Sequence, residues 1–269
     1  MSKIKWDQIG ERKYKNGVDH GVLYVGVGGS YPKGVAWNGL TTVTKSPSGA
    51  EDNKIYADNI NYFNLKSAET LGLTIECYMY PDEWSECNGE AELAEGLLAG
   101  QQRRKTFGFS YRNNIGNDTE GQDYGYEINM IYGCSASPSE QASNTINDSP
   151  DASTFSYEVS TTPVTVSGVD SEGKAFKPTA CLTADSTKMS KEKMQIIESI
   201  LYGKEGEYTS FSGGSFAPGK NYYELINGEY VQTKDEEYQS SKTYYECVVE
   251  PVEGRLPLPD EWRSILADG

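Results

Sequence analysis

A two-residue alternation of apolar and polar side chains, repeated in several stretches, constrains the fold of this chain most strongly. In LGLTIECYMY, residues 71–80, every second residue from Leu73 to Met79 is apolar. Successive side chains of a β-strand point to opposite faces, so the pattern predicts a strand with one buried face. The same period recurs in residues 107–111, 124–132 and 155–159 and at Val164 and Val166. The sequence therefore predicts a mainly β, antiparallel architecture.

Length and charge limit the possible domains and partners. The 269 residues suffice for one large all-β domain or two small ones. The 24 lysines and arginines are outnumbered by 40 aspartates and glutamates, which gives a formal charge of −16. A protein that grips a phosphate backbone needs a cationic surface, so we expect no specific binding of nucleic acid.

The amino-terminal stretch and the cysteines indicate a cytosolic origin. Residues 1–17 contain basic residues without an apolar run behind them, so we expect no secretory signal. No segment approaches the roughly 18 to 20 apolar residues of a membrane span, so we expect no membrane partner. The five cysteines are scattered and include no CxxC pair. This spacing disfavours a disulfide framework and a zinc site, and predicts reduced, mostly buried thiols.

Two segments have helical spacing. In NGEAELAEGLLAG, residues 88–100, Asn88 is placed to cap, and Leu93 and Leu97 would share one face. In SKEKMQIIESILYG, residues 190–203, Ser190 is placed to cap and Gly203 to end the helix in a left-handed turn. We therefore expect two helices that flank the sheets.

A short phrase occurs twice near the end of the chain, as APGKNYYE at residues 217–224 and as QSSKTYYE at 239–246. Between them, Asn227-Gly228 separates two β-prone runs and predicts a tight hairpin, and residues 242–250 predict a further strand. We interpret residues 204–250 as a small tyrosine-rich β insertion. In the rival interpretation these strands belong to the main sheet.

Motifs that suggest catalysis are weak. The glycines of GVGGS, residues 26–30, lack the following Lys-Ser/Thr of a phosphate-binding loop and predict a bend between strands. His20 is the only histidine, which excludes a multi-histidine metal site. The carboxylates that could form a glycosidase pair are Glu76, Asp82, Glu83 and Glu86. No cleft signal accompanies them, so we expect no enzyme, no cofactor and no metal.

A family resemblance is more specific than these patterns. Residues 25–89 contain GVAWNGL at 34–40, SPSG at 46–49, YADN at 56–59 and YPDEW at 80–84. ESILYG at 198–203 and RLPLPDEW at 255–262 follow later. With these motifs the chain resembles the major tail protein of long, non-contractile-tailed bacteriophages, the subunit of the tail tube. The resemblance covers most of residues 15–203 and 255–269. The chain departs from the family pattern between the last two motifs, where some fifty residues intervene.

The resemblance implies a tail-tube-type antiparallel β-sandwich or barrel with one or two flanking helices, formed by residues 1–203 with 251–269. It implies that six copies close into a ring and that rings stack into a tube, the conduit for DNA ejection. The implied partners are other copies of the chain, a tape-measure protein inside the tube, a tail terminator, and distal tail or baseplate proteins. Genomic DNA would pass through the lumen without specific binding. The implied location is the virion tail, assembled in the host cytoplasm.

Two stretches are candidate contacts between subunits. The first is a long polar loop between two strand-like runs, an arm that would reach the adjacent ring: Lys45, Ser46, Pro47, Ser48, Gly49, Ala50, Glu51, Asp52, Asn53 and Lys54. The second is implied by the resemblance near the carboxyl end: Arg255, Leu256, Pro257, Leu258 and Pro259. YPDEW is either a functional contact or a strand-ending turn with a packed Trp84.

Alternatives remain open at this point. A carbohydrate-binding or adhesin-like β-sandwich would also use tyrosine-rich strands and acidic loops. A third alternative is an acidic β-sandwich glycosidase. A related injection-apparatus tube would look nearly the same as a phage tail tube.

Overall fold

A computed structural model of the chain describes residues 3–49, 51–143, 145, 152–233 and 238–268. Strands make up 49% of it and helices 10%. The prediction of a mainly β fold with antiparallel sheets is therefore confirmed.

The largest sheet has eight antiparallel strands. Its path, in spatial order, is β2 (Gly34–Trp37), β1 (Lys13–Val25), β9 (Phe107–Asn117), β10 (Gly121–Ala136), β11 (Phe155–Thr161), β6 (Thr70–Cys77) and β3 (Leu40–Ser48). The eighth strand, β12 (Cys181–Asp185), pairs with β10 off this path. Strands expected at 71–80, 107–111, 124–132 and 155–159 are thus confirmed. Val164 and Val166 are not in a strand, and Val164 forms only an isolated bridge with Thr179.

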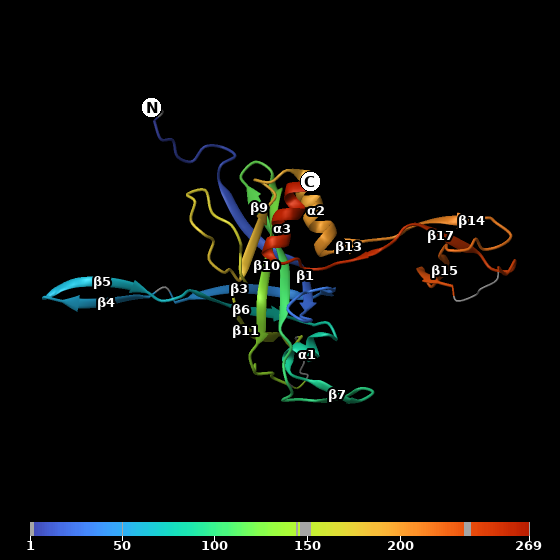
Figure 1. Cartoon of the computed structure of the whole chain (residues 1–269), viewed down its shortest axis with the longest axis horizontal. Helices are drawn as coiled ribbons and strands as arrows, with labels where there is room; N and C mark the ends of the chain where they lie inside the picture. Colours follow the sequence, from blue (N-terminus) through green and yellow to red (C-terminus); the bar gives the residue numbers. More distant parts are fainter. Residues whose placement is uncertain (1–2, 50, 144, 146–151, 234–237, 269) are drawn as a thin grey trace.

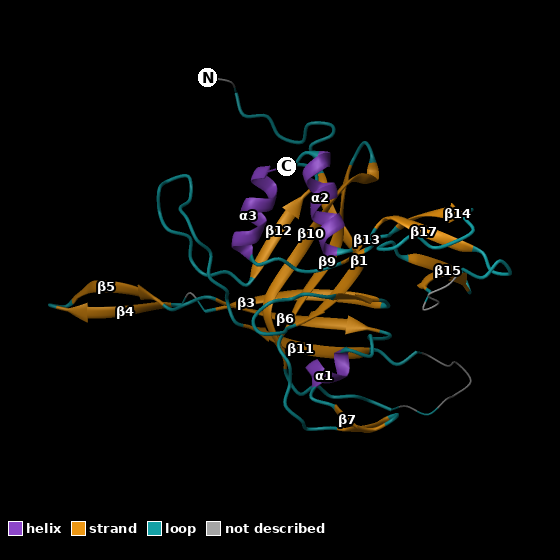
Figure 2. Ribbon diagram, turned by 45° about the vertical axis from the view of Figure 1, so that its right-hand side comes forward, coloured by secondary structure: helices purple, strands orange, loops and turns teal. Residues whose placement is uncertain are grey.

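Strand β10 divides this sheet into two layers. It pairs with β12 from Glu127 to Ile131 and with β11 only from Cys134 to Ala136. The strands β11, β6 and β3 therefore form a second layer that packs across β1, β9 and β10. The helices α2 (Lys191–Leu201) and α3 (Pro259–Asp268) lie against the opposite side of β10 and β12 (Figure 2).

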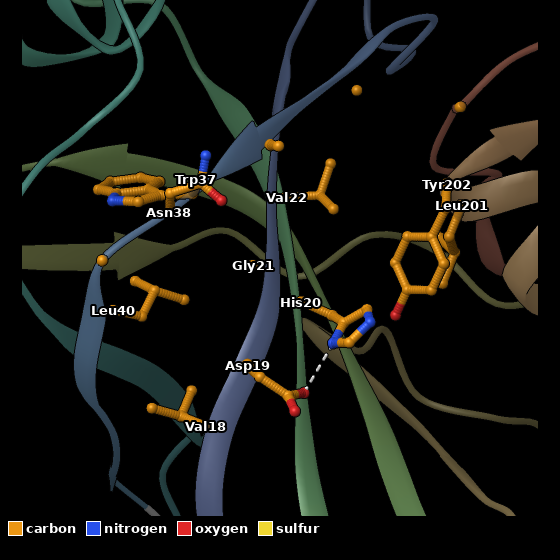
Figure 3. Close-up of a pocket in the computed structure, with 14 residues that line it drawn as sticks. Val18, Asp19, His20, Gly21, Val22, Trp37, Asn38, Leu40, Leu201 and Tyr202 are labelled. Atoms are coloured by element: carbon orange, nitrogen blue, oxygen red, sulfur yellow. Dashed lines mark ion pairs between the residues drawn. The ribbon is translucent and has the colours of Figure 1, made fainter.

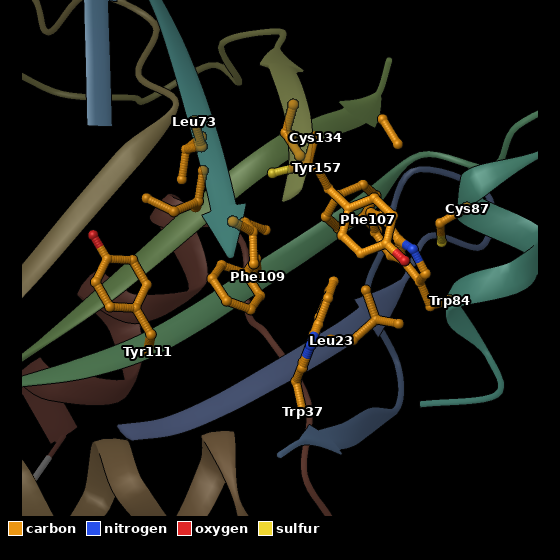
Figure 4. Packing of buried hydrophobic residues seen from close by; sticks show 14 of the residues in the cluster. Leu23, Trp37, Leu73, Trp84, Cys87, Phe107, Phe109, Tyr111, Cys134 and Tyr157 are labelled. Carbon is orange, nitrogen blue, oxygen red and sulfur yellow. The ribbon is translucent and has the colours of Figure 1, made fainter. Parts of the chain in front are cut away.

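Each face of the central layer contributes to a different core, which explains the two-residue alternation. On β1, Leu23 belongs to the core between the two sheet layers, whereas Val22 and Tyr24 belong to the core under the helices. The inter-sheet core is rich in aromatic rings (Figure 4). Trp37 and Trp84 lie at its centre, with ring centroids 4.7 Å apart. Trp84 is fully buried, which confirms the packing interpretation of YPDEW.

The helix expected at 190–203 is confirmed as α2. The hydroxyl of Ser190 accepts a hydrogen bond from the backbone N–H of Lys193, and Met194, Ile197 and Leu201 are buried. Gly203 follows with a φ of 83°. A Cβ there would lie 2.4 Å from the carbonyl oxygen of Val252, so only glycine fits this crossing of two chain segments.

The prediction of a helix at residues 88–100 is wrong. The actual helix, α1 (Trp84–Asn88), ends where the expected one begins, and Gly89 caps it with a φ of 84°. The strands β7 (Ala91–Ala94) and β8 (Leu97–Ala99) follow as a hairpin. Gly96 has a φ of 74° in its turn. A glycine that supplies this turn outweighs the weak helical preference of a short segment without a packing partner.

Two elements project from opposite sides of the body (Figure 1). One is the hairpin of β4 (Asp52–Ala57) and β5 (Ile60–Lys66). The other is a separate sheet in the order β14 (Glu207–Phe211), β17 (Tyr244–Val249), β15 (Tyr222–Ile226) and β16 (Glu229–Gln232). The short strands β13 (Gly203–Lys204) and β18 (Val252–Glu253) pair where the chain enters and leaves it. The rival interpretation, in which these strands join the main sheet, is wrong.

The repeated phrase forms the centre of this second sheet. Both copies read Lys-x-Tyr-Tyr-Glu and lie on the neighbouring antiparallel strands β15 and β17, where Tyr223 is opposite Tyr245. The lysine of each copy forms an ion pair with the glutamate of the other, Lys220 with Glu246 and Lys242 with Glu224. The Asn-Gly hairpin is confirmed between β15 and β16, since Asn227 and Gly228 both have positive φ.

Candidate subunit-contact surfaces

The expected arm loop at residues 45–54 has a different structure. Lys45 to Ser48 belong to β3 and pair with β6, and Asp52 to Lys54 belong to β4. The side chain of Lys45 reaches into the body, where its Nζ donates to Oδ1 of Asn129 at 2.5 Å. Gly49 and Glu51 lie between the strands, and Ala50 lies outside the described residues. Most of this segment is therefore in strands instead of a loop, because its backbone groups pair with β6 and β5.

The element that projects as an arm is the β4–β5 hairpin (Figure 1). Every residue of both strands is exposed. Six large apolar or aromatic side chains on it are each between 41% and 66% exposed: Ile55, Tyr56, Ile60, Tyr62, Phe63 and Leu65. An exposed apolar surface of this kind on a soluble protein is typical of a surface that contacts another molecule.

The hairpin has little support of its own. Asp58 and Asn59 form its turn with φ values of 50° and 66°, and Ile55 pairs with Phe63 across the strands. An isolated two-stranded hairpin is only marginally stable in water. Within the described residues, the hairpin has no third strand and no buried residue to stabilise it. The sequence signal for this element was the dense run of β-branched and aromatic residues on both sides of Asp58-Asn59.

The segment expected to form a carboxyl-terminal contact, Arg255 to Pro259, packs against residues of the same chain. Leu256 is buried, and its N–H donates to the carbonyl oxygen of Tyr31 at 3.1 Å. A Cβ on Gly108 would lie 2.4 Å from Leu256, so the glycine lets this segment lie close to β9. Pro257 accepts a hydrogen bond from the hydroxyl of Tyr132 at 3.0 Å. A contact between these residues and another subunit stays a prediction.

Helix α3 is held by polar contacts at its start. Arg255 Nη1 lies 2.7 Å from Oε2 of Glu261, and the N–H of Leu258 donates to the same carboxylate. Burial opposes ionisation of Glu261, but these two hydrogen bonds outweigh it and lower the pKa of the carboxyl. The indole N–H of Trp262 donates to the hydroxyl of Tyr132 at 3.0 Å, which fixes the helix on β10.

The four-stranded part of the main sheet, β1-β9-β10-β12, has two open edges. Strand β2 pairs with β1 only from Gly21 to Tyr24, so residues 13–18 have no partner strand on that side within the described part of the chain. Among the described strands, β12 pairs with β10 alone. Unpaired edges of this kind can accept a strand from another copy.

One face of this part of the sheet is polar. Lys15 Nζ lies 2.5 Å from Oε2 of Glu127. The buried Asn129 donates to Asn113 at 3.2 Å and accepts from Thr183 at 3.1 Å. The charged and amide groups are thus joined across the strands. The carboxylate of Glu127 on this face is thus paired with Lys15.

A hollow of about 570 Å³ lies between β1, β2 and the end of α2 (Figure 3). His20 on β1 has a φ of 49°, and its Nδ1 lies 3.0 Å from Oδ1 of Asp19. Hydrogen bonds from the Arg112 guanidinium lower the pKa of the Asp19 carboxyl despite its partial burial. The rest of the lining is mainly glycine and apolar residues. The charged side chain of the hollow, Asp19, therefore forms an ion pair with Arg112 on the neighbouring strand β9, and His20 lies beside it.

The other weak motifs have local structural roles. GVGGS forms a tight bend in which Val27 and Ser30 pair and Gly28 and Gly29 have positive φ. Glu86, one of the possible glycosidase carboxylates, forms an ion pair with Lys105. All five cysteines are free, and three of them are buried.

Within the described residues, no cluster of three or more His, Cys, Asp or Glu side chains is suited to hold a metal ion. None of the described helices has the length and apolar character needed to cross a membrane.

No protein-family model matches the chain, and no curated protein matches it significantly. The link to tail tube proteins therefore rests on the motifs quoted above.

Proposed function

We propose that this chain is a structural subunit that assembles into stacked hexameric rings, the tube of a long non-contractile phage tail. The exposed apolar surface of the β4–β5 hairpin carries the proposal. Six large side chains on a hairpin without a core of its own are costly to leave in water, and a neighbouring subunit would cover them. The resemblance of the motifs to those of tail tube proteins is the reason to propose stacked rings in particular.

The open edges of β1-β9-β10-β12 support ring closure. The two free edges belong to different strands, so a contact between β1 of one copy and β12 of the next would be heterologous. Heterologous contacts between identical subunits close into a ring when the rotation between copies divides a full turn. In the proposed assembly, each copy uses the hairpin and both edges to hold its neighbours.

The proposed tube surrounds a tape-measure protein and is completed by a tail terminator and by distal tail or baseplate proteins. Genomic DNA passes through it without specific binding, and the subunit performs no catalysis. The net charge of −16 agrees with weak contact to phosphates. A wall built from the polar face of β1-β9-β10-β12 would present paired charges such as Lys15 with Glu127. Acids that repel DNA would then have to lie elsewhere on the wall.

Electron microscopy of the purified full chain over a range of concentrations tests the proposal. Rings or tubes of one uniform diameter are the expected result, and light scattering should show particles that grow with concentration. A protein that stays monomeric at every concentration would contradict the proposed function.

The alternative of a carbohydrate-binding module receives less support from the tyrosine-rich sheet. A sugar would need an open aromatic face, but Tyr208 and Tyr230 stack on each other with centroids 3.9 Å apart. Tyr223 lies beneath Tyr208 at 4.9 Å and is itself buried. These rings already cover one another, which favours a structural role for the aromatic residues.

A further inference from the structure

Large apolar side chains are exposed in several regions besides the β4–β5 hairpin, among them the projecting sheet. Two further regions combine such side chains with opposite charges. The first is the amino-terminal segment, residues 3–9. Ile4, Trp6 and Ile9 are each at least 70% exposed. Lys3 and Lys5 alternate with Ile4 and Trp6, so residues 3–6 in an extended conformation have one apolar and one basic side. The segment becomes anchored at Gly10, whose N–H donates to Asp118 in the β9–β10 turn at 3.0 Å.

The second region is the β7–β8 hairpin. Leu93, Leu97 and Leu98 are each more than half exposed, and Leu93 lies at the irregularity between the two strands. Glu90, Glu92 and Glu95 accompany them, with no basic residue from 90 to 99. The hairpin thus presents leucines and a local charge of −3. As a sheet of only two strands, it also has open edges that can pair with an extended chain.

The two regions lie at opposite ends of β9. Residues 3–9 leave the body at the β9–β10 turn. The hairpin is tied to the other end of β9, where the N–H of Gln102 donates to Gly89 and that of Lys105 to Glu86. Both views of the molecule show the segment that precedes β1 and the strand β7 at opposite ends, with the sheets between them (Figures 1 and 2).

The segment is too short to reach the hairpin of its own subunit. Strand β9 has 11 residues, which span roughly 33 Å at the rise of a β-strand. The seven residues before Gly10 extend at most about 25 Å. A contact between the two regions must therefore join two copies of the chain.

Charge favours this pairing over a contact with the β4–β5 hairpin. Residues 3–9 carry Lys3 and Lys5 against Asp7, a charge of +1. Residues 90–99 carry −3, whereas residues 51–67 carry three acids and two lysines, a charge of −1. Opposite charges steer association and penalise wrong partners. The apolar side of the segment matches the leucines, and its basic side matches the glutamates.

We propose that residues 3–9 of one copy pack as an extended strand along the β7–β8 hairpin of another copy. The inference rests on the proposed self-assembly. It names a contact between opposite ends of two subunits, as in successive layers of a stack. Lys3 and Lys5 lie beside Glu90 and Glu92 of the neighbouring copy, while Ile4 and Trp6 cover its leucines.

A charge exchange in the full chain tests the contact. Lys3→Glu with Lys5→Glu, or Glu90→Lys with Glu92→Lys, should raise the protein concentration needed for tube growth at least about tenfold. The four substitutions together should restore growth to within about threefold of the original protein, because opposite charges face each other again. Glu205→Lys with Glu207→Lys makes the same change of net charge as the Glu90 and Glu92 variant, at the start of the projecting sheet, and should leave growth unchanged. Normal growth of both double variants, or no rescue by the combination, would overturn the inference.

Crosslinking separates a failure of the inference from a failure of the proposed function, because it does not require tubes. An Ile4→Cys variant mixed with a Leu98→Cys variant should give a disulfide-linked heterodimer under mild oxidation. Each variant alone provides the background from the native cysteines, and Ile4→Cys mixed with Leu225→Cys is the matched control. A heterodimer without tubes would retain the contact and reject the tube. Tubes of the unmodified chain without the heterodimer would reject the contact and retain the tube.

Discussion

The two elements that project from the body differ in how many of their own side chains they bury. The tyrosine-rich sheet β14–β17 has a small core of its own, in which Tyr222 and Tyr244 are buried against Phe216. The β4–β5 hairpin has no buried residue. The sheet therefore has buried residues of its own, although it also exposes apolar side chains such as Leu225, Val231 and Val248. The hairpin leaves all of its apolar side chains exposed, and in the proposed assembly a neighbouring copy would cover them.

Replacement of the hairpin should have the largest effect. The backbone groups of Glu51 and Ser67 are hydrogen bonded to each other, so a short Gly-Ser linker can replace residues 52–66 without moving β3 or β6. We expect a folded subunit whose thermal midpoint changes by less than about 3 °C but which forms no tubes in electron micrographs.

The matched comparison replaces residues 206–248 with a linker of the same type. This variant should stay soluble and still form rings and tubes, because β13 and β18 bring the two chain ends together. Aggregation of this variant, or tubes of normal length from the hairpin replacement, would reverse the distinction between the two elements.

A large-to-small substitution should next disrupt the projecting sheet alone. The ring of Tyr244 packs against those of Phe216 and Tyr238 and has no access to solvent. Tyr244→Ala should cost about 3 kcal/mol or more of the local free energy of unfolding, and faster hydrogen exchange in residues 207–249 would measure it.

The exposed Val248 provides the control, since Val248→Ala should change the local free energy of unfolding by no more than about 0.5 kcal/mol. Tube assembly of both variants should be normal. If Tyr244→Ala abolished assembly while the body stayed folded, the sheet would be part of a subunit contact.

A single substitution in the hairpin should have a moderate effect on assembly and almost none on folding. Phe63 is 54% exposed and is followed by the polar Asn64 on the same strand. Phe63→Ser should raise the concentration needed for tube growth about tenfold, whereas Asn64→Ser should not. Thermal unfolding of both variants should match that of the original protein. Equal effects of the two substitutions would mean that the apolar surface of the hairpin makes no contact.

Of the predicted effects, the smallest should be that of acid on the thermal stability of the body, to which both elements attach. The Arg112 guanidinium lowers the pKa of Asp19 in the folded protein, so the ion pair stabilises the fold above the unfolded pKa of about 3.9. That contribution is lost as the pH falls through the lower folded value. Asp19→Asn should therefore lower the thermal midpoint at pH 7 and reduce its fall between pH 5 and pH 3. Parallel pH profiles of the two proteins would contradict this role.

Local patterns were sufficient to predict the parts of the fold that depend on nearby residues. The alternation around Leu73 and the capped stripe after Ser190 both predicted the correct elements, because each has one apolar face that meets a core. The helix prediction for residues 88–100 was wrong because the apolar residues of this segment contact no core. Gly96, in the turn of the hairpin, determines the structure instead. The short strand β12 had no comparable signal.

The candidate contacts were harder to predict for a related reason. The polar residues around Pro47 suggested an exposed arm, but the exposed apolar residues lie further along, from Ile55 to Leu65. An alternating or aromatic run shows that one face prefers to be buried. It does not show whether the covering surface belongs to the same chain. In Arg255 to Pro259, Leu256 is buried by residues of the same chain, while a contact of this segment with another copy stays a prediction.

The crossing at Gly203 has a consequence for what the molecule can carry. The chain leaves the body at Gly203 and returns at Glu253, and these two residues are direct partners in the β13–β18 pair. A guest sequence placed between them starts and ends at neighbouring points, so the entropy of closing the loop grows only slowly with its length. The body is thus a carrier with one built-in attachment point. If the tube forms as proposed, a foreign domain whose own ends lie close together could be displayed there once per subunit along its length.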